Sequence, residues 1–315
     1  MTDSFTDEEA KVYDRQIRLW GIHAQQKIRS ADVLVIGLTG LATEVVKNLV
    51  LAGINSITLI DDKLVTDFDM LSNLFTRNQV GKNRAEAIQK YVQELNPMVI
   101  VKIKNISLTD ILLDEDGAKS FIKQFHVVVL VNHSSQSIIE LNKICNYSNV
   151  PFFSACAWGF FSMVFCDLGK NFNGIRFVPF NEVLSSKSFN LNSNLNVRRA
   201  KTYKSIFLVF LTLFKFYEKN KTFPEILNED NREELVANLQ SLEREILEEL
   251  NAHGNQSWTI FDGWHSKVFG QFSFISSIVG GLLAQDIIRS VTKDNIVTNF
   301  FFFDGLKGFN LNIGI

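Results

Sequence analysis

Residues 33–62, VLVIGLTGLATEVVKNLVLAGINSITLIDD, set the fold class of the chain. The apolar run Val33–Ile36 predicts a buried strand, Ala42–Ala52 predicts a helix, and Ser56–Ile60 predicts a second strand that ends at two aspartates. A strand, a glycine turn, a helix and a strand with an acidic end form the first unit of many nucleotide-binding α/β domains. We therefore expect an α/β fold built on a doubly wound, Rossmann-like and mostly parallel sheet.

The glycine turn of this unit departs from the dinucleotide-binding pattern. A G-x-G-x-x-G loop that begins at Gly37 would have glycines at positions 39 and 42, where this sequence has Thr39 and Ala42. The second glycine of such a loop lets the backbone approach the phosphates, and the third lets the helix pack on the strand. Ala42 is small enough to pack, and Gly40 helps to make the turn, but the β-branched Thr39 would obstruct the phosphates. We expect the turn to form without its phosphate site.

The acidic end of the second strand carries Asp61 and Asp62. An acidic residue at this place can accept hydrogen bonds from the hydroxyl groups of a ribose. At the end of a strand it is more often a solvated loop residue. We therefore expect Asp61 to be at most a remnant of a nucleotide site.

Strands and helices alternate as far as about residue 155, which is typical of a doubly wound sheet. Beyond about residue 170 the pattern changes, and residues 180–255 are expected to form polar helices. The tail returns to an apolar helix and a pair of strands that turn at Asp304-Gly305. The expected organisation is a Rossmann-like half with an N-terminal helix over residues 1–170, a small helical insertion over 171–255, and a C-terminal helix and strands over 256–315 that complete the domain.

Composition narrows the classes of partner. The net charge of -2 over 315 residues gives no electrostatic reason to expect nucleic acid or an anionic membrane as a partner. The N-terminal segment is unlike a targeting signal, and the apolar run from Ile206 is too short to span a bilayer, so we expect a soluble intracellular protein.

The three cysteines lack C-x-x-C spacing, so we expect no metal site and no disulfide framework. Cys156 falls in a predicted buried strand.

The segment TDEEAKVYDRQIRLWG predicts an N-terminal helix. The helix would begin at the capping-box pair Thr6 and Glu9 and could end at Gly21. An apolar stripe along one of its faces is typical of docking onto a core. Docking does not explain the two arginines that lie between the apolar positions, Arg15 and Arg18.

Ordered motifs along nearly the whole chain resemble the ThiF/MoeB-like superfamily of ubiquitin-like-protein activating enzymes, and within it the small subunits of SUMO-activating enzymes. The motifs are YDRQIRLWG, AQQKIRSADVLVIG, LTGLATEVVKNLVLAGI, VGKNRAEA, LNPMV and the closing VGGLLAQD with FFFFDGLKG. The resemblance implies an inactive adenylation domain of the ThiF/MoeB type. Such a domain would serve as the regulatory subunit of a heterodimer with a large catalytic subunit.

The resemblance also implies where the chemistry takes place. The partner subunit would bind ATP and Mg²⁺, adenylate the C-terminal carboxylate of SUMO, and accept the acyl group on its own cysteine. SUMO would be held mainly through that large subunit. The family arginine at the position of Arg15 reaches the partner's ATP site in trans, whereas Arg18 is expected to pack or to form a salt bridge. The family further implies a nuclear protein, with the cytoplasm as a second compartment.

Departures from the family pattern point to an incomplete nucleotide site on this chain. Active members carry an arginine and a glutamine where this sequence has Leu71 and Ser72, and Arg84 stands in place of a motif lysine. With Thr39 in the turn, the phosphate-binding set is incomplete. No intact cofactor site is expected, and the vestiges of one would be Gly37, Gly40, Asp61 and Arg84.

Other classes of protein share parts of this pattern. A self-sufficient homodimeric enzyme of the MoeB type would need the intact glycine turn and the phosphate-binding arginine. The small subunit of a NEDD8-type activating enzyme would carry a longer insertion than residues 171–255 provide. A nicotinamide dehydrogenase is disfavoured by Thr39 and by the RQIRLWG helix. A non-catalytic scaffold differs from our interpretation in one testable respect, because it would contribute no residue to adenylation.

Overall fold

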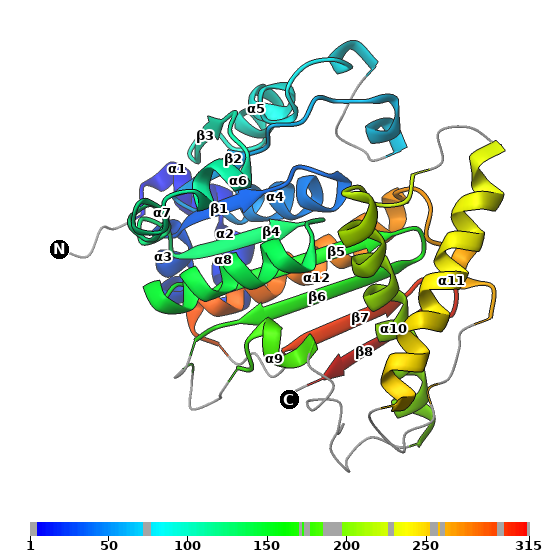
Figure 1. Cartoon of the computed structure of the whole chain (residues 1–315). Coiled ribbons are helices and arrows are strands. Elements are labelled where there is room, and N and C mark those ends of the chain that lie inside the picture. Colours follow the sequence, from blue (N-terminus) through cyan, green and yellow to red (C-terminus); the bar gives the residue numbers. More distant parts are fainter. Residues whose placement is uncertain are drawn as a thin grey trace.

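The structure, a computed structural model, describes residues 5–71, 77–169, 172, 177–184, 197–225, 230–252, 258, 262–294 and 299–313. One eight-stranded sheet runs through this part of the chain, with helices on both of its faces (Figure 1). The strand order is β3-β2-β1-β4-β5-β6-β7-β8. Neighbours are parallel from β3 to β5 and antiparallel from β5 to β8, which confirms the predicted mostly parallel α/β sheet.

The first two strands lie close to their predicted bounds. The strands of the sheet are β1 (Asp32–Ile36), β2 (Ser56–Ile60), β3 (Ile100–Lys104), β4 (Val127–Val131), β5 (Phe152–Trp158), β6 (Phe161–Asp167), β7 (Phe300–Asp304) and β8 (Phe309–Ile313). Every residue of the central strand β4 is buried, as expected for an apolar run covered on both faces. β2 and β4 lie on opposite sides of β1, and doubly wound sheets bind ligands at this switch in strand order.

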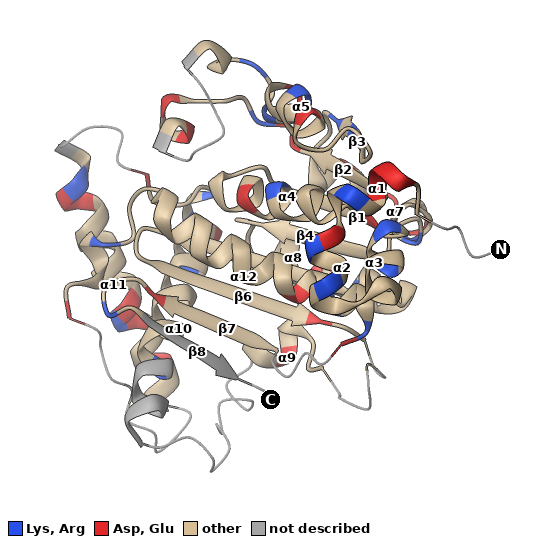
Figure 2. Ribbon diagram, turned by 180° about the vertical axis from the view of Figure 1, so that it is seen from behind, with Lys and Arg blue, Asp and Glu red and all other residues tan. Residues whose placement is uncertain are grey.

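Two helical layers cover the sheet. On one face lie α2 (Asp14–Trp20), which α1 (Asp7–Val12) precedes, α3 (Ile22–Arg29), α4 (Gly40–Ala52), α5 (Arg84–Leu95) and α12 (Ser273–Thr292), as Figure 2 shows for α4 and α12. On the other face lie α6 (Leu108–Leu112), α7 (Glu115–Ile122), α8 (Ser135–Ser148), α9 (Phe180–Leu184), α10 (Val197–Asn220) and α11 (Asp230–Ala252). Three 3-10 turns complete the described elements: η1 (Asp67–Leu71), η2 (Arg77–Gln79) and η4 (Trp264–Ser266).

The N-terminal segment differs from the single helix that was expected. The Thr6–Glu9 capping box is present, but the helix breaks at Tyr13 into α1 and α2, and a third helix follows Gly21. The break places the Tyr13 ring in the core, where its hydroxyl accepts a 2.8 Å hydrogen bond from the Asn96 amide. The ring lies so close to Gly53 that a Cβ there would be 2.4 Å from it. The helix is therefore interrupted at the residue whose side chain is buried in the core.

The segment expected to be a helical insertion packs directly on the sheet. Phe207, Phe210 and Phe214 of α10 are buried in one cluster with residues of β4, β5 and β7. α11 also has an apolar stripe, and its Leu239 and Leu242 are buried in the same cluster. Much of the rest of this segment, including residues 185–196 and 226–229, lies outside the described part.

α12 is long and apolar enough, by length and composition alone, to cross a membrane. In this fold one of its faces is buried against α4 and the sheet. The two helices meet closely at Gly280, where an added Cβ would lie 2.7 Å from the Cβ of Glu44. At the adjacent Gly281 an added Cβ would meet no atom of the described residues within 4 Å.

This contrast gives a test of the helix crossing. We expect Gly280→Ala to destabilise the chain by about 1–3 kcal/mol, because the new methyl group forces α12 away from α4. The matched variant Gly281→Ala should instead stabilise the chain by about 0.5–1 kcal/mol, because alanine replaces a mid-helix glycine in open space. Urea unfolding of both variants measures the two changes. Equal free energies of unfolding for the two variants would contradict the crossing.

Candidate functional site

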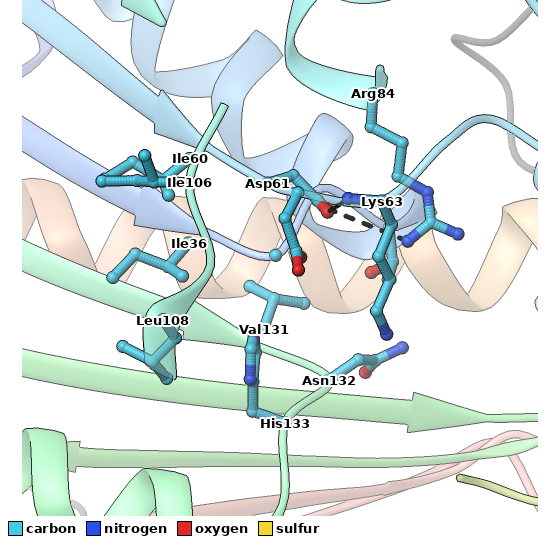
Figure 3. Close-up of a pocket in the computed structure, with 13 residues that line it drawn as sticks. Ile36, Ile60, Asp61, Lys63, Arg84, Ile106, Leu108, Val131, Asn132 and His133 are labelled. Atoms are coloured by element: carbon cyan, nitrogen blue, oxygen red, sulfur yellow. Dashed lines mark hydrogen bonds and ion pairs between the residues drawn. The ribbon is translucent and has the colours of Figure 1, made fainter. Parts of the chain in front are cut away.

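The carboxyl ends of β1, β2 and β4 surround one small cavity at the switch in strand order. Its lining includes three of the predicted residues, Gly37, Asp61 and Arg84, together with Lys63 and His133. Figure 3 shows Asp61, Lys63 and Arg84 gathered on one side and His133 at the end of β4. The cavity holds about 20 Å³, which is room for about one water molecule, whereas small-molecule sites span roughly 300–1,000 Å³.

Gly37 is required by the fold itself. Its φ of +85° lies in the left-handed region, and a Cβ would stand 2.3 Å from the carbonyl oxygen of Val131. The same Cβ would approach Nε2 of His133 to 3.1 Å. The turn therefore needs glycine at this position for packing against β4, whether or not a ligand is present.

The carboxylate of Asp61 accepts hydrogen bonds from two nearby backbone N–H groups. One oxygen accepts a 2.6 Å hydrogen bond from the N–H of Leu38 in the glycine turn, and the other accepts one of 2.8 Å from the N–H of Lys63. Burial raises the pKa of Asp61, and the Arg84 charge and these two N–H groups oppose that rise. Asp61 thus ties the end of β2 to the turn that follows β1.

The N-terminus of α4 is occupied by a side chain from a distant part of the chain. The N–H of Gly40 donates a 3.0 Å hydrogen bond to the side-chain oxygen of Gln271, just before α12. Thr39 is the N-cap residue, but its buried hydroxyl makes no hydrogen bond within the described part of the chain. A helix N-terminus of this kind is where a phosphate would bind. Sequence reasoning missed Gln271, because a separation of 231 residues leaves no local signal.

The positive charge of Arg84 is neutralised by Asp69, a residue that the sequence analysis did not single out. Its guanidinium lies 2.8 Å from one oxygen of Asp69 and donates to the other at 3.0 Å and 3.2 Å. The third guanidinium nitrogen, Nη1, lies 3.8 Å from a carboxylate oxygen of Asp61. Asp69 is buried and also accepts from the backbone N–H of Thr66. The charge that could have bound a phosphate is therefore compensated inside the chain.

Several other predicted residues have no place in this cavity. Arg15 is exposed on α2, and within the described residues its side chain has no ion pair or hydrogen bond. Arg18, by contrast, pairs with Asp14 at 3.0 Å, as expected. Ser72 and the side chain of Leu71 lie outside the described part. No cluster of three or more His, Cys, Asp or Glu side chains suited to a metal ion occurs among the described residues.

All three cysteines are buried. Burial raises the pKa of Cys156, in β5, to about 12, and it also raises the pKa values of Cys145 and Cys166. A cysteine nucleophile acts as the thiolate. These thiols remain protonated at neutral pH and are suited to packing.

The Arg84–Asp69 pair can be tested by a double-mutant cycle. We expect Asp69→Asn to destabilise the chain by about 2–3 kcal/mol, because a buried guanidinium loses its main counter-charge. Arg84→Met in the same background should restore at least half of that loss, since it removes the uncompensated charge while the new amide oxygen can still accept from Thr66. Urea unfolding of the wild type, both single variants and the double variant measures the coupling, and additive losses would contradict it.

We expect His133 to make the free energy of unfolding depend on pH. Burial, together with the charge of Lys63, lowers the pKa of His133 from 6.5 to about 4. The unfolded chain therefore binds the proton first as the pH falls, so this contribution to stability is lost between pH 6.5 and pH 4. Because the residue as a whole is only partly buried, we expect a loss of about 1–2 kcal/mol relative to His133→Asn. Urea unfolding at several pH values measures it, and parallel pH profiles for the two proteins would disprove it.

Comparisons with known proteins agree with this architecture. The ThiF family profile matches residues 13–313. SUMO-activating enzyme subunit 1 of Dictyostelium discoideum is 32% identical over 97% of this chain and 93% of its own length. The proteins of the same name from Homo sapiens and Xenopus tropicalis are 30% and 28% identical, over 96% and 95% of this chain and 94% of their own lengths. The chain therefore belongs to the ThiF family, and along nearly its whole length it is a homologue of proteins named SUMO-activating enzyme subunit 1.

Proposed function

We propose that this chain is the regulatory subunit of a heterodimeric SUMO-activating enzyme and that it supplies Arg15 in trans to the ATP site of a large catalytic subunit. The observation that carries the proposal is the contrast between two cations. Arg84, at the chain's own candidate site, is paired with Asp69, whereas Arg15 is exposed and unpaired within the described residues. The shared name of the relatives, subunit 1, supports the existence of a second subunit.

The proposal assigns ATP and Mg²⁺ to the partner. Three groups that could contact a nucleotide on this chain already have internal partners: the Leu38 N–H, the Gly40 N–H and the Arg84 guanidinium. A cavity of about 20 Å³ does not accommodate a nucleotide. The residues present do not fit ATP, so no step of the reaction is placed at this cavity.

The proposed reaction has two steps. A carboxylate oxygen of the SUMO C-terminus attacks the α-phosphate of ATP and releases pyrophosphate, and a cysteine thiolate of the large subunit then attacks the acyl adenylate and releases AMP. SUMO is held mainly by the large subunit. Arg15 contacts the terminal phosphate, where a permanently charged planar guanidinium stabilises negative charge on the departing group. The raised pKa values of the three buried cysteines support placement of the thioester on the partner.

Two alternatives lead to different outcomes in reconstitution. A subunit of a NEDD8-type enzyme would support ATP–pyrophosphate exchange with that modifier but not with SUMO. A scaffold would support the large subunit equally well with or without Arg15. We place the assembled enzyme in the nucleus, with the cytoplasm as a second compartment, and fractionation of cells that express the tagged chain tests this location.

Arg15→Ala is the decisive variant. With the candidate large subunit and SUMO, we expect it to slow ATP–pyrophosphate exchange by about 10²–10³-fold, because one charge-stabilising group is removed from the transition state. The melting temperature and the formation of the heterodimer should not change, since the side chain of Arg15 makes no hydrogen bond or ion pair within the described part of its own chain.

Arg18→Ala is the matched control, because Arg18 lies on the same helix but pairs with Asp14. An exposed pair of this kind contributes about 0–1 kcal/mol, so the exchange rate should stay close to that of the wild type. Thioester formation should occur on the large subunit alone. A wild-type exchange rate in the Arg15→Ala complex would remove Arg15 from the mechanism and favour the scaffold.

A further inference from the structure

β3 forms an open edge of the sheet. It pairs with β2, and no strand of the described residues lies on its other side. The N–H of Ile100 donates a 3.0 Å hydrogen bond to the carbonyl oxygen of Asn55, just before β2. Because backbone groups alternate in direction along a strand, the N–H and C=O groups of Val101 and Ile103 point away from β2. Figure 1 shows β3 beside β2 at this margin of the sheet.

The two faces of β3 carry different side chains. Val101 is buried and Ile103 is half-buried, both in the cluster beneath α4 and α5. On the opposite face, Ile100, Lys102 and Lys104 are all exposed, and the exposed fraction of Ile100 is 52%. The helical layer on that face therefore leaves a strip of one apolar and two basic side chains uncovered along the edge of the sheet.

The two lysines of this strip keep their positive charges. Neither Lys102 nor Lys104 makes an ion pair within the described part of the chain. The ammonium group of Lys104 lies 4.4 Å from the centre of the Phe121 ring in α7, a contact that positions the charge without neutralising it. Lysines on an edge strand repel a second copy of the same strand. The same two charges attract a strand that carries carboxylates.

We propose that the edge of β3 is a docking site for an extended acidic segment of a partner protein, which adds to the sheet as a further strand. In this mode the outward backbone groups of Val101 and Ile103 supply the hydrogen bonds, and alternate side chains supply specificity. Side chains that face each other on adjacent strands have Cβ atoms about 4.5–5.5 Å apart. Carboxylates at alternate positions of the segment therefore meet Lys102 and Lys104. The site is independent of the large subunit and adds a second kind of partner to the proposed function.

The test measures binding of a fluorescent peptide of alternating valine and glutamate residues to the full chain. We expect the Kd to rise at least about tenfold for the double variant Lys102→Glu/Lys104→Glu, because the glutamates of the peptide then meet like charges. The matched control is Lys90→Glu. Lys90 lies on α5, which packs on β3, and its side chain is 89% exposed, so this variant changes the net charge equally per residue but should leave the Kd unchanged. Melting curves establish that both variants are folded.

A second measurement tests strand addition separately from charge. The peptide should slow hydrogen exchange of the Val101 and Ile103 amides, which point outward, and should leave the exchange of the Ile100 amide unchanged, because that N–H already donates to Asn55. The same peptide with alternate backbone nitrogens methylated keeps its charge but loses hydrogen-bond donors, so its Kd should be much higher. A peptide with lysine in place of glutamate should not bind.

Four outcomes overturn the inference. They are failure of the glutamate peptide to bind the wild-type chain, an unchanged Kd for Lys102→Glu/Lys104→Glu, equal binding of the methylated peptide, and equal binding of the lysine peptide. Light scattering of the chain alone tests for a second copy at the edge. A dimer that protects the Val101 and Ile103 amides without the peptide would assign the edge to that copy and also overturn the inference. None of these results bears on the proposed function, since the large subunit is not needed for the measurement.

Discussion

The 2.6 Å hydrogen bond from the Leu38 N–H to the Asp61 carboxylate joins the first two strands of the fold at the turn that begins α4. Without an acceptor, this buried N–H would lose its hydrogen bond to water and gain nothing in return. The bond fixes the path of the turn. That path packs Gly37 against the end of β4 and sets the direction of the first N–H groups of α4. The orientation of α4, and hence its crossing with α12, depends on this contact.

A chain of contacts links the same turn to α11. Glu243 of α11 is buried and accepts from the indole N–H of Trp264 at 2.8 Å, and it lies 3.0 Å from Nε2 of His265. A few residues further on, the carbonyl oxygen of Gly270 accepts from Gly159 in the β5–β6 turn, and Gln271 accepts from Gly40. The segment between η4 and α12 therefore holds α11, the β hairpin and the start of α4 together, so α11 is part of the support of the glycine turn.

The sequence predicted those features that depend on local pattern. The β1-turn-α4-β2 unit and the turn at Asp304-Gly305 follow from periodicity and glycine placement, and both occur. The break at Tyr13 could not be predicted, because it depends on Asn96 and Gly53, which are distant in sequence. For the same reason, Asp69 and Gln271 were missed as partners of Arg84 and Gly40. The sequence analysis identified Gly40 and Arg84 at the candidate site, whereas only the fold shows that Gln271 and Asp69 are their partners.

The internal partners around the cavity have an evolutionary consequence. If the domain descends from one that bound a nucleotide, Thr39→Gly alone would clear space and leave every internal bond in place. Gln271 would still cap α4, Asp61 would still hold the turn, and Asp69 would still neutralise Arg84. Each of these partners stabilises the chain, so selection for folding opposes its removal one residue at a time. Once the protein satisfies these groups from within, restoring a nucleotide site requires several simultaneous changes rather than one.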